Sequence, residues 1–343
     1  MLISMKDIAR ECGVSVATVS KALSGQKDIS LDTQKKIRTK AAEMGYQANS
    51  AARALKTNRT YNIGVLLFDE QHSGLAHEYF SSVLESIRVE AENKGYDITF
   101  ISANVGKRPA SYLQHCRYRG VDGVIIVSVD FDDPMVRELA ESEIPIVSLD
   151  HKFNNRMAVM SDNVSGTEEL TKRAIEMGHR RIAFIHGERT TVTENRLTGF
   201  HRACEEYGLR IDEKFIRESR YHDPDLCNLV VKQMLGAKSR PTCILLPDDF
   251  SAIGGINAIR EAGMSIPKDI SIIGYDGIGL SQVLEPRLST WKQDTDSLGR
   301  ISVNKLVKLI EHPKTTVADT ETVKGSFIEG TSLAPVTTVE HRA

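Results

Sequence analysis

The chain has 343 residues, of which 26% are charged and 41% are hydrophobic, and its formal net charge is −2. This length predicts two or three domains, and no apolar run approaches the roughly 20 residues of a membrane-spanning helix. Because the first residues lack the features of a secretory signal peptide and the five cysteines are scattered without a CxxC pair, we expect a cytoplasmic protein with reduced thiols rather than disulfides or thiolate-bound metal.

The charge is unevenly distributed along the chain. Residues 1–60 contain 11 Lys or Arg and 5 Asp or Glu, a net charge of +6, whereas the remainder contains 33 and 41, a net charge of −8. A basic N-terminal segment on an acidic body is compatible with a segment that contacts phosphate groups. The alternative is that these charges are only solvated surface.

The first 48 residues have the pattern of three short helices. Ser4 opens the first helix with a capping box, and Gly13 ends it. Ser15 can cap a second helix and Ser30 a third, which Gly45 closes. Two short helices joined by a glycine-containing turn form the helix-turn-helix pattern, in which the second helix enters the major groove of DNA.

The second helix has an apolar face and an opposite face of small, polar or cationic residues. Small apolar side chains at its start can contact a thymine methyl group, and a lysine can reach guanine O6 and N7 or a phosphate. The candidate DNA-contacting residues of this helix are Ser15, Val16, Ala17, Thr18, Ser20 and Lys21. The alternative is a small helical bundle that does not contact DNA.

Three strings in this region resemble the LacI/GalR family of bacterial transcription regulators. They are VSVATVSKAL at residues 14–23, GY at 45–46 and NSAARAL at 49–55. The resemblance continues through DNVSG at 162–166, MGHRRIAFI at 177–185 and GYDGIG at 274–279. It implies a helix-turn-helix head, a hinge helix and a two-lobed effector-binding body, which act as a homodimer on a palindromic operator in double-stranded DNA.

Residues 49–57 correspond to the hinge helix of that family. The segment is rich in alanine and offers little apolar surface, so its helix should be marginal on its own. In the family this helix orders against its dimer mate in the minor groove, where a leucine wedges into the central base step. The resemblance assigns the wedge to Leu55, with Asn49, Ala52 and Arg53 matching the family's pattern. One departure is Ala48, where the family usually has proline.

Short apolar runs follow from residue 61, as expected for strands buried on both faces of a parallel sheet. They lie at 63–68, 121–128, 144–150, 181–187, 243–249 and 270–276. Helical patterns lie between or after them, at 79–94, 166–177, 194–207, 251–262 and 295–311. This alternation predicts doubly wound α/β units in two sets.

The predicted fold class is therefore an N-terminal all-α helix-turn-helix head with a hinge helix, followed by an α/β two-lobed, periplasmic-binding-protein-like body of doubly wound parallel sheets. We expect the head at 1–48, the hinge helix and linker at 49–60, and the effector-binding and dimerisation domain at 61–343. Its lobes would comprise about 61–161 with 292–324, and about 162–291 with 325–335. Because no leucine heptads follow, we expect a dimer rather than a tetramer.

Polar residues follow several predicted strands, where doubly wound sheets bind ligands. The carboxylates at these ends are Asp69, Asp150, Asp248, Asp249 and Asp276. Carboxylates with an arginine suit sugar hydroxyls, because ionised oxygens accept strong hydrogen bonds. The resemblance places Arg196, Asp248, Asp276 and Gln293 at the effector site. The aromatic candidates for stacking on a sugar ring are Phe80, Tyr221 and Trp291.

Each of these residues has a structural alternative. An aspartate after a strand is often the N-cap of the next helix, which applies to Asp248, Asp249 and Asp276. Trp291 fits a core position equally well, and Asp162 fits a cap better than a ligand. His72 and His77, which flank Gly74 near the predicted mouth of the cleft, fit a surface loop better than a ligand contact.

Enzyme and metal motifs are absent from the sequence. There is no GxSxG, P-loop, HExxH or GxGxxG after a strand, and the ten histidines show no metal-ligand spacing. We therefore expect no catalytic residue, cofactor or metal ion.

The sequence predicts a sequence-specific DNA-binding transcriptional repressor, controlled allosterically by a small molecule, with a sugar favoured. Two alternatives keep the DNA-binding role but use a nucleobase effector or a phosphoprotein corepressor. A solute-binding protein of a transporter is the alternative from another class, and the basic head and absent signal peptide argue against it. A sugar-processing enzyme is the remaining alternative.

Overall fold

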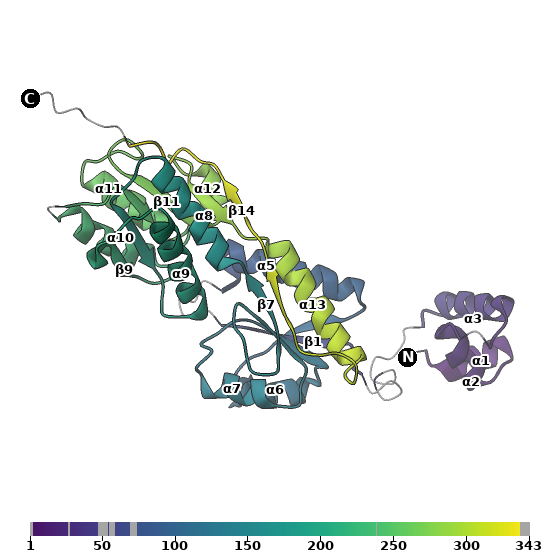
Figure 1. The fold of residues 1–343 in the computed structure, drawn as a ribbon. Helices are drawn as coiled ribbons and strands as arrows, with labels where there is room; N and C mark the ends of the chain where they lie inside the picture. Colours follow the sequence, from purple (N-terminus) through teal and green to yellow (C-terminus); the bar gives the residue numbers. More distant parts are fainter. Residues whose placement is uncertain are drawn as a thin grey trace, which may run out of the picture. The chain divides into compact units, whose positions relative to one another are not determined.

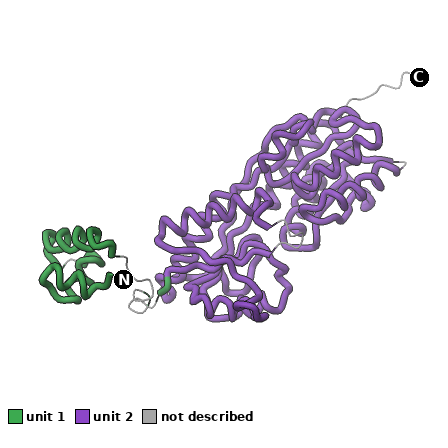
Figure 2. The backbone as a smooth tube through the Cα atoms, turned by 180° about the vertical axis from the view of Figure 1, so that it is seen from behind, with its two compact units in different colours: residues 1–60 green, residues 61–343 purple. Residues whose placement is uncertain are grey.

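The computed structural model describes residues 3–26, 28–46, 54, 59–68, 74–237 and 239–336 (Figure 1). The chain forms two compact units, residues 1–60 and 61–343, which Figure 2 colours green and purple. We call the second unit the body and keep the name head for the three helices within the first.

The head begins with the three helices that the sequence predicts. They are α1 Met5–Cys12, α2 Val16–Leu23 and α3 Leu31–Glu43. Ser4 forms the expected capping box with Asp7, and the hydroxyls of Ser15 and Ser30 accept backbone hydrogen bonds at the starts of α2 and α3. The apolar faces of the three helices pack into one small core around the fully buried Ile37.

The body contains two six-stranded sheets. The first has the order β13-β7-β6-β5-β1-β2, with every pair parallel. Its strands are β1 Asn62–Leu67, β2 Asp97–Phe100, β5 Gly123–Ser128, β6 Ile146–Leu149, β7 Met157–Ser161 and β13 Thr320–Val323. A short ribbon of β3 Asn104–Val105 and β4 Arg108–Pro109 lies apart from this sheet.

Helices cover both faces of this first sheet. The core on one face contains residues of α5 Glu78–Asn93 and α13 Thr295–Glu311, and α13 runs beside α5 in Figure 1. The core on the other face contains residues of α6 Tyr112–Arg119 and α7 Pro134–Glu141. We call this sheet and its helices the first lobe.

The second sheet has the order β14-β12-β11-β10-β8-β9, in which only β14 is antiparallel to its neighbour. Its strands are β8 Ile182–His186, β9 Ile216–Glu218, β10 Cys243–Leu245, β11 Ser271–Asp276, β12 Ser289–Lys292 and β14 Ser326–Ile328. This sheet belongs to the second lobe.

Two helix pairs cover the faces of the second sheet. The pair on one face is α8 Asn163–Glu176 and α9 Thr191–Glu206, and the pair on the other is α10 Pro224–Leu235 and α11 Ala252–Glu261. The shorter elements of the body are η1 Gly74–Ala76, η2 Glu213–Phe215 and α12 Leu280–Val283.

The helical head and the two-lobed α/β body of the predicted fold class are confirmed, with local differences at the ends of elements. The strand predicted at 243–249 ends at Leu245, shortly before Pro247, which has no amide hydrogen to donate to a ladder. The helix predicted from 166 begins at Asn163, because the carboxylate of Asp162 accepts the amide hydrogen bond of Ser165 at 3.1 Å. Asp162 is thus the cap that the sequence predicts.

Among the described residues, no helix combines the length and the apolar character that crossing a membrane requires.

Candidate functional site

The outward side of α2 carries the residues predicted to contact DNA. Ser15, Val16 and Ala17 are exposed, and Thr18, Ser20 and Lys21 are partly exposed. On the opposite side of the helix, Val19 and Ala22 are fully buried in the core of the head. The core therefore fixes which face of α2 is turned outward, away from the other two helices of the head.

Lys21 makes an ion pair with a residue that the sequence did not single out. Its Nζ lies 2.5 Å from Oδ2 of Asp28, in the loop that leads to α3. The hydrogen bond from Lys21 lowers the pKa of Asp28, so this carboxylate is ionised at neutral pH. Any base or phosphate that binds Lys21 has to compete with Asp28 for the ammonium group.

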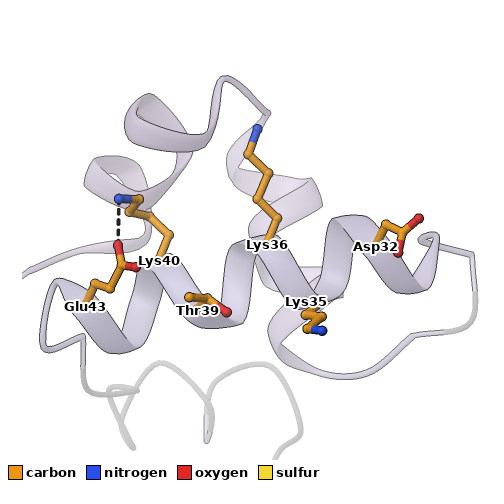
Figure 3. Close-up of a pocket in the computed structure, with 6 residues that line it drawn as sticks. All are labelled: Asp32, Lys35, Lys36, Thr39, Lys40 and Glu43. Atoms are coloured by element: carbon orange, nitrogen blue, oxygen red, sulfur yellow. Dashed lines mark hydrogen bonds and ion pairs between the residues drawn. The ribbon is translucent and has the colours of Figure 1, made fainter.

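A shallow pocket lies along the outer side of α3 (Figure 3). Its charged and polar lining consists of Asp32, Lys35, Lys36, Thr39, Lys40 and Glu43. Within it Lys40 and Glu43 form an ion pair of 2.7 Å. The mixture of charges on one helix surface is typical of a solvated face, and we assign it no site.

Some predicted site residues lie outside the described residues. They are Asn49, Ala52, Arg53 and Leu55 of the hinge segment and Asp69 after β1. Their roles, and the hinge helix itself, stay predictions.

Arg196, on α9, lies at the centre of a buried polar cluster. Its Nε donates to Oδ1 of Asn163 and its Nη1 to the carbonyl of Pro247, both at 2.8 Å. The guanidinium carbon lies 3.5 Å from the ring centroid of Tyr275, a cation–π contact. Burial opposes the charge of Arg196, but the surrounding phenols and carboxylates outweigh it and raise the pKa of Arg196. The arginine is therefore a fixed buried cation.

Asp276 and Gln293 face this arginine. Gln293 Nε2 donates to Asp276 Oδ1 at 2.7 Å, and Arg196 Nη2 lies 3.7 Å from the same oxygen. Burial raises the pKa of Asp276, whereas the nearby Arg196 lowers it. The Oε1 of Gln293 is buried and has no hydrogen-bond partner in the described part of the chain. It is therefore an acceptor that a ligand hydroxyl can use.

The first lobe contributes Asp150 and Tyr79 to the same place. Asp150 follows β6 and accepts hydrogen bonds from the amide and hydroxyl of Ser161, at 2.6 and 3.2 Å. Burial raises the pKa of Tyr79, and the charges of Asp150 and Asp276 raise it further. Charges from both lobes thus act on one phenol. We call Tyr79, Asp150, Arg196, Asp276 and Gln293 the inter-lobe cluster.

The two aspartates after β10 differ in role. The carboxylate of Asp248 accepts hydrogen bonds from the amide and hydroxyl of Ser251, both at 2.7 Å, and from the amide of His222 at 2.9 Å. Asp248 therefore organises the turn before α11, although the N-cap residue of that helix is Ser251. The capping alternative is wrong for Asp249, whose carboxylate instead accepts hydrogen bonds from the amide of Ile278 and the hydroxyl of Thr290.

The three aromatic candidates lie in different surroundings. Tyr221 is near the cluster, with its ring centroid 5.4 Å from the guanidinium carbon of Arg196. Phe80 belongs to the core of the first lobe, and its ring lies 5.4 Å from that of His222 in the second. Trp291 packs against the core beneath α8, with its indole next to Gly166. The core alternative therefore describes the surroundings of Trp291.

Unusual backbone geometry marks the same region. Among the described residues, five non-glycine residues have positive φ, and three of them are Asp150, His222 and Asp276, with φ of 53°, 58° and 99°. Such conformations cost free energy and concentrate at ligand sites. Asp150 and Asp276 belong to the inter-lobe cluster, and the ring of His222 lies 3.8 Å from that of His77 in the first lobe.

Sequence reasoning missed several residues of this region. The sequence predicts Phe80 but not its neighbour Tyr79 as a site residue, and it marks Asn163 only as part of the DNVSG string. His77 was predicted to lie in a surface loop, but it is only 4% exposed and its ring lies 3.8 Å from that of His222. No sequence spacing could find this pair, because its members lie 145 positions apart.

Comparisons with known proteins agree with this architecture. Residues 4–49 match the family described as bacterial regulatory proteins, lacI family, and residues 171–333 match a periplasmic binding protein-like domain. The ribose operon repressor of Haemophilus influenzae is 33% identical over 90% of this chain and 92% of its own. The repressor PurR of an Escherichia coli strain is 30% identical over 96% of this chain and 97% of its own.

Two solved structures extend the similarity to three dimensions. The lac repressor dimer bound to operator and the anti-inducer ONPF has a TM-score of 0.79 and 25% identity, covering 97% of this chain and 100% of that chain. A LacI family regulator from Enterococcus faecium with bound ribose has a TM-score of 0.70 and 25% identity, covering 80% and 100%.

These relatives decide between the predicted functions. They are transcriptional repressors, which confirms a DNA-binding regulator rather than an enzyme, and the head that matches them disfavours a solute-binding protein of a transporter. The lac repressor in the solved structure is a dimer bound to operator. The chain belongs to the LacI family of bacterial regulatory proteins.

Proposed function

We propose that this chain is a cytoplasmic repressor that binds a palindromic operator through α2 and the hinge segment and releases or retains it according to a sugar bound at the inter-lobe cluster. We assign the DNA-binding head to residues 1–48, the hinge and linker to 49–60, and effector binding and dimerisation to 61–343. The base-contacting surface is the outward face of α2.

The observation that supports a polyhydroxylated effector is the polar inventory of the inter-lobe cluster. Gln293 offers an unpaired acceptor, Asp276 and Asp150 offer carboxylate oxygens, and Arg196 offers donors held by neighbouring residues. A sugar presents hydroxyls that both donate and accept, so it satisfies all of these groups at once. One buried arginine among carboxylates disfavours an anionic effector.

Burial explains how such a ligand would control DNA binding. Arg196, Asp276 and Gln293 are only 5 to 6% exposed, and residues of both lobes surround them. A ligand reaches them only when the lobes separate, so ligand binding and lobe arrangement are thermodynamically coupled.

A nucleobase is the second candidate effector. The rings of His77, Phe80 and His222 lie within 5.4 Å of one another across the lobes, and a planar base can stack on such rings. PurR is among the relatives.

The test is a thermal-shift screen followed by calorimetry. Ribose is the first probe, because a ribose operon repressor is a relative and a similar structure holds ribose; other sugars and purine bases complete the set. Gln293→Leu removes the unpaired acceptor and should weaken sugar binding by about tenfold, whereas Gln233→Leu, exposed on α10, should have no effect. If only purine bases stabilise the protein, the effector is a nucleobase and not a sugar. If neither class of compound stabilises it, the proposed effector site is wrong.

A paired prediction concerns base reading by α2. If Lys21 reads a base, Lys21→Ala should cost about 1–3 kcal/mol on the preferred operator and little on unrelated DNA. Asp28→Asn frees Lys21 from its ion pair and removes a negative charge, so it should tighten binding to all sequences, most strongly at low salt. Fluorescence anisotropy at several salt concentrations measures both effects. An equal loss on all DNA in Lys21→Ala would reassign Lys21 to a phosphate.

A further inference from the structure

We propose that His77, His222 and Asp248 form a binding site for a divalent transition-metal ion that bridges the two lobes. Each residue offers one ligand atom, a ring nitrogen or a carboxylate oxygen, and these three atoms lie within 4.8 Å of one another. The site lies beside the inter-lobe cluster, because His222 follows Tyr221, whose ring centroid lies 5.4 Å from the guanidinium carbon of Arg196. It does not depend on the identity of the proposed effector.

The three ligands come from separate parts of the body. His77 is the N-cap residue of α5 in the first lobe and is 4% exposed. His222 and Asp248 belong to the second lobe, where they follow β9 and β10. Asp248 is 1% exposed, and its hydrogen bonds from Ser251 and from the amide of His222 hold it in place. Hydrogen-bonded partners of this kind orient metal ligands.

The donor set selects the class of metal. Imidazole nitrogens suit zinc, copper, nickel and iron, and two histidines with one carboxylate leave coordination positions open for water or a ligand hydroxyl. Zinc–nitrogen bonds of about 2.0–2.1 Å put two ligands of a tetrahedral site about 3.3 Å apart. The ligand atoms therefore have to approach by at most about 1.5 Å, which rotation of the two neighbouring rings can provide.

The position of the site between the lobes determines what a bound metal ion does to the lobe arrangement. Because one ligand belongs to the first lobe and two to the second, the complete site exists only while the lobes stay together. A metal ion that binds this arrangement more tightly than a separated one shifts the population toward it. The ion should therefore oppose the lobe separation that a ligand needs to reach Arg196.

The experiment uses the full-length, chelator-treated chain without an affinity tag. Titration with Co²⁺ should give a saturable visible absorption band at one ion per chain, which Zn²⁺ abolishes by competition. His77→Gln and His222→Phe should each weaken Co²⁺ binding by at least about 100-fold, the loss that removing even a hydrogen-bond partner of a metal ligand can cause. His222→Phe keeps an aromatic ring against His77 and Phe80, so the packing between the lobes is preserved.

Two controls distinguish this site from cobalt binding elsewhere on the chain. His201→Gln replaces an exposed histidine of α9 in the second lobe and should leave the titration unchanged. The described cysteines are all buried and free, so no thiolate-to-cobalt charge-transfer band should appear. The proposal is wrong if the parent protein shows no saturable binding, if both ligand variants bind as the parent does, or if a thiolate band accompanies binding. Effector is omitted throughout, so failure here leaves the sugar screen unaffected.

Discussion

Arg196→Ala is expected to lower the free energy of unfolding of the body by about 3–5 kcal/mol and to abolish the response to effector. The substitution leaves the carboxylate of Asp276 without its cation and leaves Oδ1 of Asn163 and the carbonyl of Pro247 without their donors. The ring of Tyr275 also loses the guanidinium that lies 3.5 Å from its centroid. A partner removed from a buried charged network costs more than the net value of the contact, because the remaining groups stay desolvated.

Denaturant unfolding of the body, followed by a probe of the second lobe, measures this loss. Arg202→Ala is the matched control, because Arg202 lies exposed on the same helix and should change stability by no more than about 0.5 kcal/mol. Arg196→Lys keeps the charge but not the planar fork of donors, so it should fall between the two. If Arg196→Ala unfolds at the same denaturant concentration as the parent and still responds to effector, the arginine has neither role. Operator binding should survive below the transition, because α2 lies in the other unit.

The elements that the sequence predicted well are those with a strong periodic signal. The strands β1 and β11 stand out because both of their faces are apolar. The helices α5 and α13 stand out because each has a full apolar stripe. The missed β2, β9 and β13 are short strands at or near sheet edges, and the burial of their residues is mostly partial or absent. The sequence pattern of such a segment does not distinguish a strand from a loop until the neighbouring strand is known.

The candidate site also contains both residues that the sequence predicts and residues that it does not. The family resemblance predicts Arg196, Asp276 and Gln293 at the effector site, and the structure brings them into contact. The positions of Tyr79, Asn163 and the His77–His222 pair depend on contacts between distant segments, which no local pattern encodes. Asp248 and Asp249 are adjacent and chemically identical, and only the positions of Ser251 and Thr290 decide that the first organises a turn and the second joins two strands.

Leu55→Ala is expected to reduce specific operator affinity by about 100-fold or more while leaving effector affinity unchanged. Leu55 is the only bulky apolar residue in 49–57, a segment otherwise rich in alanine, so it is the only side chain there that can act as a wedge between base pairs. A homodimer inserts two copies, and burying each leucine contributes about 1.5–3 kcal/mol. This gain must exceed the unstacking of a base step, which costs a few kcal/mol, and the ordering of a marginal helix.

Without the wedge the operator should also bend less, because kinking follows from the unstacked central step. Circular-permutation gel shifts measure the bend, and anisotropy measures the affinity on operator and on unrelated DNA. Lys56→Ala is the control from the adjacent position: removing its positive charge should weaken binding to every sequence and reduce the salt dependence, without changing the bend. Non-specific binding by Leu55→Ala should fall far less than specific binding, since phosphates set it. An operator that Leu55→Ala kinks as much as the parent does would remove the wedge from the mechanism and leave specificity to α2 alone.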